Sequence, residues 1–206
     1  MSRASVIKKA YLCIDEVYPD ITDQDIPAFN VEEFLDQAAR LIIQIAPART
    51  LGTLAVDYTN NNTDAPLISV IGGVGRIQLK DSFARLVSFQ AEDWSSVVTE
   101  ALDDTSPRYK QQNNPILRGK PNRPMVFITD GGKYLEYYTT NTTGEGLSRG
   151  LKKFYAVFFD GVDDNYPTKL EDITAWKTAE LVLSTMGDTS AATNCTNRVT
   201  EILQTL

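Results

Sequence analysis

Residues 181–192 have the sequence Leu-Val-Leu-Ser-Thr-Met-Gly-Asp-Thr-Ser-Ala-Ala, in which a glycine and an aspartate separate two helical patterns. Gly187 stands where a helix ends in a left-handed residue, and Asp188 or Thr189 can cap the next helix. The apolar residues at helical spacing are Leu170, Ile173, Trp176, Ala179, Leu181, Val182, Leu183 and Met186 before the turn, and Ala192, Cys195, Val199, Ile202 and Leu203 after it. Because the link is so short, we expect an antiparallel helical hairpin.

Two further helices are predicted at the start of the chain. Residues 3–17 carry apolar side chains at intervals of three and four, and Tyr18-Pro19 ends this pattern. The second helix is expected to begin at Asn30, which can cap it with Glu33 as the partner in a capping box, and to end before Pro47. Each helix pair has an apolar face to bury, so the simplest packing is one four-helix unit.

The sequence between the two helix pairs is typical of strands and turns. Apolar and polar residues alternate in Arg76-Ile77-Gln78-Leu79-Lys80, as in a half-buried strand. The glycine-rich residues 72–75 indicate a turn between strands, and Gly131-Gly132 indicates a β-hairpin. The predicted strands are residues 66–71, 76–80, 83–89, 124–129, 134–138 and 151–159.

These elements predict an α+β fold with an inserted domain. We expect a four-helix bundle-like unit of residues 1–50 and 165–206, with an antiparallel β-sandwich or barrel domain of residues 51–164 inserted into it. Two domains side by side are the alternative. The insertion is favoured because the last two helices can bury their apolar stripes against the first two.

Charge is divided unevenly along the chain, which has 20 Lys and Arg residues, 27 Asp and Glu residues and a net charge of −7. Residues 1–64 and 161–206 together carry a net charge of −9, and residues 65–160 carry +2. The acidic excess therefore belongs to the helical unit. An acidic protein is a poor general binder of nucleic acid, which requires a cationic surface.

The segment 105–129 is basic, contains no acidic residue and holds four prolines. We expect an extended loop here, and loops of this length are usually functional or disordered. The candidate interface residues in it are Arg108, Tyr109, Lys110, Arg118, Lys120 and Arg123. Three interpretations stay open: a solvated flap, a clasp that docks on the acidic helical unit of the next copy in a ring, and, less favoured, a contact with nucleic-acid phosphate.

Composition excludes the enzyme classes that depend on histidine, while enzymes built on Asp, Glu, Lys or Ser remain allowed. The chain has no histidine, so it has neither a Ser-His or Cys-His pair nor a histidine-based metal site. Cys13 and Cys195 are too few for a disulfide framework and are expected to be buried. The spacing of Asp160, Asp163 and Asp164 lacks the ligand pattern of a calcium loop. We expect no enzymatic activity, no catalytic, metal-binding or cofactor-binding residues, and no membrane-spanning segment or signal peptide.

Several stretches resemble proteins of the phage neck. They are residues 76–86 (RIQLKDSFARL), Trp94 and Val97, residues 106–113 (SPRYKQQN), Pro124 and residues 135–137 (Leu-Glu-Tyr). Residues 176–180 (Trp-Lys-Thr-Ala-Glu) with Gly187-Asp188 resemble the helical hairpin of phage adaptor proteins. Over residues 28–206 the chain thus resembles head-to-tail connector, or neck ring, proteins of short-tailed phages, especially the crAss-like phages of Bacteroidota.

This resemblance implies a structural protein of the virion. The expected assembly is a homo-oligomeric ring, commonly twelvefold, which joins the portal protein to the tail or to other neck rings. It would be assembled in the bacterial host cytoplasm and would let DNA pass without specific binding. An acidic channel lined by the helical unit is the mechanism we expect, because it repels phosphate. Another virion ring or accessory protein, such as a tail-proximal stopper or a capsid-associated protein, is the alternative. A carbohydrate- or peptide-binding β-module is a further one, which would expose Tyr137, Tyr138 or Tyr155 in one patch.

Overall fold

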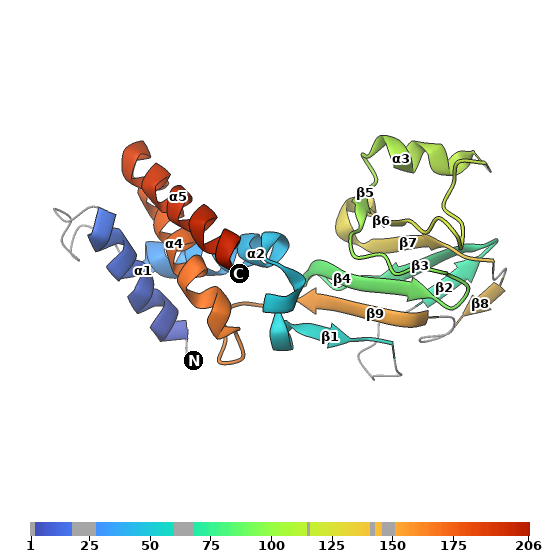
Figure 1. Cartoon of the computed structure of the whole chain (residues 1–206), viewed down its shortest axis with the longest axis horizontal. Helices are drawn as coiled ribbons and strands as arrows, with labels where there is room; N and C mark the ends of the chain where they lie inside the picture. Colours follow the sequence, from blue (N-terminus) through green and yellow to red (C-terminus); the bar gives the residue numbers. More distant parts are fainter. Residues whose placement is uncertain (1–2, 18–27, 60–67, 115, 141–142, 146–150) are drawn as a thin grey trace. The chain divides into compact units, whose positions relative to one another are not determined.

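A computed structural model describes residues 3–17, 28–59, 68–114, 116–140, 143–145 and 151–206 (Figure 1). The chain divides into two compact units, which we call unit 1 (residues 1–54 and 159–206) and unit 2 (residues 55–158). Unit 1 holds the long helices and unit 2 holds both sheets, so the fold is α+β with a β-sandwich-like domain, as predicted. The unit boundaries lie at 54/55 and 158/159, whereas the sequence pattern placed them at 50/51 and 164/165.

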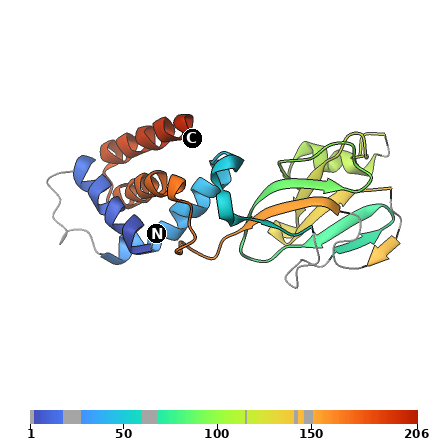
Figure 2. The ribbon, with the colours of Figure 1, turned by 60° about the horizontal axis from the view of Figure 1, so that its bottom comes forward.

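Unit 1 is built around one central helix. Its long helices are α1 (Arg3–Val17), α2 (Ala28–Ile45), α4 (Thr168–Thr185) and α5 (Thr189–Thr205). Because α4 packs against the other three (Figure 2), its buried side chains lie all around it and it lacks a single apolar stripe. Among the described residues, no helix is long and apolar enough to cross a membrane.

Local sequence rules account for the turn between α4 and α5. α1 spans the predicted residues 3–17, while Tyr18-Pro19 lie outside the described residues. After α4, Gly187 adopts a φ of 83°, and the Asp188 carboxylate accepts a hydrogen bond of 2.9 Å from the backbone N–H of Ala191. The predicted helical hairpin is therefore confirmed.

The predicted start of the second helix is wrong. α2 begins at Ala28, so Asn30 lies inside the first turn and is not the capping residue. Ala28 and Phe29 already belong to the helix, whereas a capping residue must lie outside the first helical turn; Pro27 lies outside the described residues. The end of α2 at Ile45, before Pro47, is as predicted.

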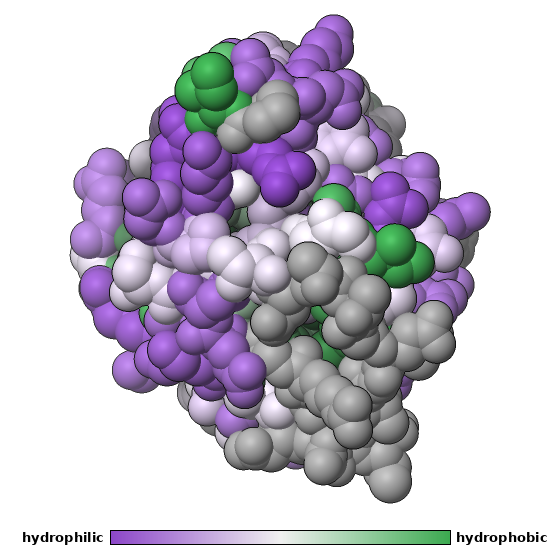
Figure 3. Space-filling model, turned by 90° about the vertical axis from the view of Figure 1, so that its right-hand side faces the viewer, coloured by the Kyte–Doolittle hydropathy of each residue, from purple (hydrophilic) through white to green (hydrophobic). Residues whose placement is uncertain are grey.

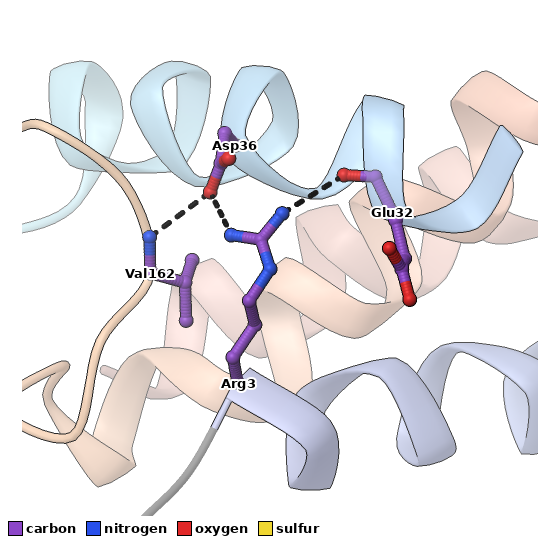
Figure 4. A network of polar contacts seen from close by, with 4 residues as sticks. All are labelled: Arg3, Glu32, Asp36 and Val162. Carbon is purple, nitrogen blue, oxygen red and sulfur yellow. Dashed lines mark hydrogen bonds and ion pairs between the residues drawn. The ribbon is translucent and has the colours of Figure 1, made fainter. Parts of the chain in front are cut away.

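Asp36 of α2 joins three segments of unit 1 (Figure 4). Its Oδ1 accepts hydrogen bonds from the Arg3 guanidinium of α1 at 2.6 Å and from the backbone N–H of Val162 at 2.9 Å. Arg3 also donates to the backbone carbonyl of Glu32 at 3.1 Å. These contacts hold α1, α2 and the segment before α4 together just after the chain has re-entered unit 1.

Unit 2 consists of two sheets that share one apolar core. One sheet has the order β1 (Ala55–Asp57), β9 (Leu151–Phe158), β4 (Phe83–Ala91), and the other has the order β5 (Leu102–Asp103), β6 (Val126–Thr129), β7 (Tyr134–Tyr138), β3 (Val74–Gln78), β2 (Ile68–Ile71), β8 (Thr143–Glu145). The core contains the rings of Phe89 and Phe154 from the first sheet, Tyr137 from the second and Trp94 from the loop after β4. Neighbouring strands are antiparallel, as predicted, apart from the short parallel pair β5 and β6 at the edge of the second sheet.

Two glycine turns connect strands of the six-stranded sheet. Asp130, Gly131 and Gly132 have φ values of 53°, 66° and 95° between β6 and β7, which confirms the predicted hairpin. The turn predicted over residues 72–75 is shorter than expected, because β3 begins at Val74 and includes Gly75. Of the strand predicted at residues 66–71, residues 68–71 form β2 and residues 66–67 lie outside the described part of the chain.

The basic segment 105–129 is not an extended loop, contrary to the prediction. It contains the short helix α3 (Pro107–Lys110), a 3-10 turn at Gln111–Asn113 and, at its end, β6. Ser106 caps α3, since its Oγ accepts a hydrogen bond of 3.4 Å from the Arg108 N–H, and Pro107 occupies the first helical position, where its missing N–H costs nothing.

Candidate functional site

The basic segment covers the face of the six-stranded sheet that points away from the core. Along β7, Leu135 and Tyr137 point into the core, so Glu136 and Tyr138 point to the opposite face. Glu136 and Tyr138 are nevertheless only 4% and 7% exposed. Tyr109 of α3 contributes to this cover, because its ring lies 5.2 Å from the ring of Phe127 on β6.

A buried amide holds the basic segment in shape. Gln112 accepts a hydrogen bond of 2.7 Å from the backbone N–H of Gly119 and donates one of 2.6 Å to the carbonyl of Arg108. At the tip of the segment, the Arg123 guanidinium donates to the backbone carbonyls of Ile116, Leu117 and Arg118. The segment is therefore internally hydrogen-bonded rather than a freely solvated flap.

A pocket of about 790 Å³ lies between the basic segment and the sheet, and we call it the sheet-face pocket. The sheet contributes Ser69, Ile71, Val74, Arg76, Glu136 and Tyr138, and the basic segment contributes Tyr109, Lys110, Gln112, Asn113 and Arg118. A second hollow of about 500 Å³ shares Arg118 and Tyr138 with it and reaches Lys120. Pockets of this size accommodate a small ligand or a few side chains of a partner protein.

The most buried charged group of the pocket lining is the Glu136 carboxylate, and both of its oxygens accept hydrogen bonds. Arg76 and Glu136 are direct cross-strand partners on β3 and β7, and the Nε and Nη2 atoms of Arg76 each lie 3.0 Å from Glu136 Oε2. The Tyr138 hydroxyl donates to Glu136 Oε1 at 3.1 Å. Since Arg76 neutralises Glu136, the remaining charge of the pocket lining is that of Lys110 and Arg118, which is positive.

The environment of the pocket shifts the pKa values of several groups. Burial, followed by the negative charge of Glu136, raises the pKa of both Tyr109 and Tyr138. Burial alone would lower the pKa of Arg76, but its hydrogen bond to Glu136 raises that pKa above the ordinary value. The tyrosines therefore stay protonated hydroxyl groups and the arginine stays a cation, an arrangement suited to binding rather than to proton transfer. A further cation, Arg118, lies 5.9 Å from the centre of the Tyr138 ring.

Three of the six candidate interface residues line the sheet-face pocket, namely Tyr109, Lys110 and Arg118. Lys120 lines the adjacent hollow. Arg108 is exposed outside both, and Arg123 stabilises the tip of the segment. The residues that sequence reasoning missed are Arg76, Gln112 and Glu136, and Tyr138 was named only for the alternative of a binding β-module. The signal for Glu136 was present, since a single carboxylate interrupts the aromatic strand Tyr134-Leu-Glu-Tyr-Tyr138.

The described residues give little support to an exposed aromatic binding patch or to a metal site. Tyr137 is 1% exposed, and Tyr155 lies on β9 in the other sheet, so these tyrosines and Tyr138 do not form one exposed patch. On the face of unit 2 shown in Figure 3, hydrophilic side chains predominate and hydrophobic ones lie in separate spots. Within the described part of the chain, no group of three or more acidic or cysteine side chains is placed to hold a metal ion.

Comparisons with known proteins found no match that assigns a role to this site. No protein-family model matches the sequence, and no curated protein matches it either.

Proposed function

We propose that the protein is a structural subunit of a phage virion, which assembles into a homo-oligomeric ring between the portal and the tail and surrounds the channel for DNA. The resemblance of residues 28–206 to neck ring proteins supports this proposal, and it suggests twelvefold symmetry and a position at the portal vertex. The helix-helix-β-helix-helix order of the chain agrees with it.

The observation that carries the proposal is the separation of charge between the two units. Unit 1 contains 8 basic and 16 acidic residues, whereas unit 2 contains 12 basic and 11 acidic residues, and five of those cations lie in the basic segment. A subunit with one acidic and one cationic surface can associate head to tail with identical copies, and such an association closes into a ring when the rotation permits it.

The acidic unit also suits a channel for DNA. Strong binding of a duplex requires Lys and Arg side chains that replace counterions on the phosphates. Unit 1 has the opposite balance, so DNA would pass it without adhering. The nearest alternative, another ring or accessory position in the virion, rests on the same features and differs only in its neighbours.

Electron microscopy tests the proposal directly. The purified protein, alone and mixed with the portal protein encoded by the same phage genome, should form closed rings that stack coaxially on the portal. A gel-shift assay with duplex DNA at physiological salt should show no retardation. A protein that forms no rings in either sample and does not bind the portal would refute the connector function, and rings that bind only to a different virion protein would support the alternative.

A further inference from the structure

Helix α1 has one face inside unit 1 and another that is open. Val6, Ala10, Cys13 and Ile14 are buried against the bundle. Leu12 points away from them and is 59% exposed, so this face of α1 presents an apolar side chain to solvent. Asp15 and Glu16 are also exposed, and they follow Leu12 at the three- and four-residue intervals that place side chains on the same helix face.

The sheet-face pocket offers the complementary groups. Ile71 at its edge is 71% exposed, and Val74 adds a second apolar side chain to the lining. Lys110 and Arg118 supply two cations at the side formed by the basic segment. The pocket thus has an apolar part and a cationic part, and its volume of about 790 Å³ is ample for one leucine side chain and the two carboxylates beside it.

We infer that the sheet-face pocket receives helix α1 of a second copy of this chain. Leu12 of the second copy would enter the pocket against Ile71 and Val74, and Asp15 and Glu16 would face the two cations. This is the helix-in-groove mode of recognition, in which residues at i, i+3 and i+4 carry the contact. The inference rests on the proposed function in one respect: it assigns the contact that repeats from subunit to subunit around the ring.

The lining of the sheet-face pocket favours this occupant over a phosphate ligand. A phosphate group would occupy only the cationic part of the pocket and would leave Ile71 and Val74 uncovered, whereas a leucine side chain covers the apolar part while its neighbouring carboxylates face Lys110 and Arg118. Glu16 has a contact of 3.6 Å with Arg198 of its own unit, but both side chains are more than half exposed and this pair is easily exchanged for another.

The test is a charge exchange between the two surfaces, followed by sedimentation velocity and by electron microscopy with and without the portal. The variants are Asp15→Lys/Glu16→Lys, Lys110→Glu/Arg118→Glu, and the fourfold variant that combines them in one chain. Each double variant should weaken subunit association by at least about tenfold. The fourfold variant should regain association, because the charges on both surfaces are reversed and attract each other again. Lys152→Glu/Lys153→Glu is the matched control for Lys110→Glu/Arg118→Glu, since it makes the same change of charge at exposed positions on β9 and should associate like the wild type. Melting curves establish that each variant is folded.

The possible results separate this contact from the proposed function. Rings that persist in both double variants overturn the contact and leave the ring function standing. Association that is lost in the doubles and restored in the fourfold variant supports the contact, even if no complex with the portal forms and the connector function fails. Equal loss of association in the control, absence of rescue, a wild-type chain that stays monomeric with and without portal, or binding of duplex DNA that depends on Lys110 and Arg118 would each overturn the contact.

Discussion

The aromatic ring of Tyr137 occupies the space beside Gly75, its cross-strand partner on β3. A Cβ atom added at Gly75 would lie closer to the ring carbons of Tyr137 than real Cβ atoms come to other heavy atoms. Tyr137 cannot move aside, because its ring is packed against Phe89 at 4.8 Å and Trp94 at 6.0 Å in the core. Glycine at position 75 is thus required by the neighbouring strand and not by a turn.

We predict that Gly75→Ala lowers the free energy of unfolding of unit 2 by about 3 kcal/mol, the upper part of the range for overpacked cores. Chemical denaturation monitored by tryptophan fluorescence measures this. In a Tyr137→Leu background the same substitution should cost much less, because the ring has been removed. An equal cost in both backgrounds would place the strain elsewhere.

The position of Gly75 illustrates what the sequence pattern can and cannot provide. Three glycines within residues 72–75 favour a turn, and the turn does exist at Gly72 and Gly73. Gly75 belongs to the strand because of a tyrosine far away in the sequence, and local pattern carries no information about that partner. By contrast, Gly187 and Asp188 end and cap helices through bonds to their immediate neighbours, which is why the helical hairpin was predictable.

The sheet-face pocket could not be predicted for the same reason. The hydrogen bond between Arg76 and Glu136 joins residues 60 positions apart, and it depends on the register of β3 and β7. The basic composition of residues 105–129 was visible, but its compact shape depends on the buried side chain of Gln112, which is one of two adjacent glutamines with no distinguishing local signal.

Removal of Arg76 should expose the dependence of Glu136 on its partner. Arg76→Met removes the cation that faces Glu136, which is only 4% exposed, and leaves the hydrogen bond from the Tyr138 hydroxyl in place. Breaking a fully buried pair costs about 3–5 kcal/mol, and because the Arg76 side chain is 51% exposed we expect only about 1–2 kcal/mol. Addition of Glu136→Gln should restore most of this stability in thermal unfolding. A double variant less stable than Arg76→Met would contradict the assignment.

Gln112 should control the order of the basic segment. Gln112→Leu preserves the approximate volume of the side chain but leaves the Gly119 N–H and the Arg108 carbonyl without their partner. We expect a loss of about 1–3 kcal/mol and faster amide hydrogen exchange over residues 108–119. Gln111→Leu, at the exposed neighbouring position, is the matched control and should leave exchange unchanged. Protection that is equal in both variants would show that the amide does not hold the segment.

In unit 1, Lys9 compensates a carboxylate that is almost fully buried. Lys9 Nζ lies 3.0 Å from Glu171 Oε2 and 2.6 Å from Asp172 Oδ1, and Glu171 is only 1% exposed. Lys9→Met should therefore destabilise unit 1 by about 3 kcal/mol, because Glu171 loses its counter-charge. Lys8→Met, the same change at an exposed position one residue earlier, should cost less than about 0.5 kcal/mol.

The pH dependence of the Lys9 contribution has a defined sign. The hydrogen bond to Asp172, and further bonding to Glu171, raise the pKa of Lys9 above its ordinary 10.5. A raised pKa in the folded state means that the stabilisation is complete below the unfolded pKa and is lost as the pH rises through the folded one. The stability difference between wild type and Lys9→Met should be constant from about pH 6 to 9 and should shrink above about pH 10.5. A difference that grows in alkaline solution would contradict this.

The two cysteines should be unreactive in the native protein. Burial, with a smaller effect of Cys195, raises the pKa of Cys13 to about 12, and burial, with a smaller effect of Glu180, raises the pKa of Cys195 to about 11. At pH 8 roughly one thiol in a thousand or fewer would then be ionised, and only the thiolate attacks a disulfide reagent. Reaction with an aromatic disulfide reagent should therefore follow the slow unfolding of unit 1, whereas the protein in concentrated guanidinium should release two equivalents of product at once. Because Cys13 lies on α1 and Cys195 on α5, rapid labelling of either thiol in the folded protein would show that its helix separates from the bundle.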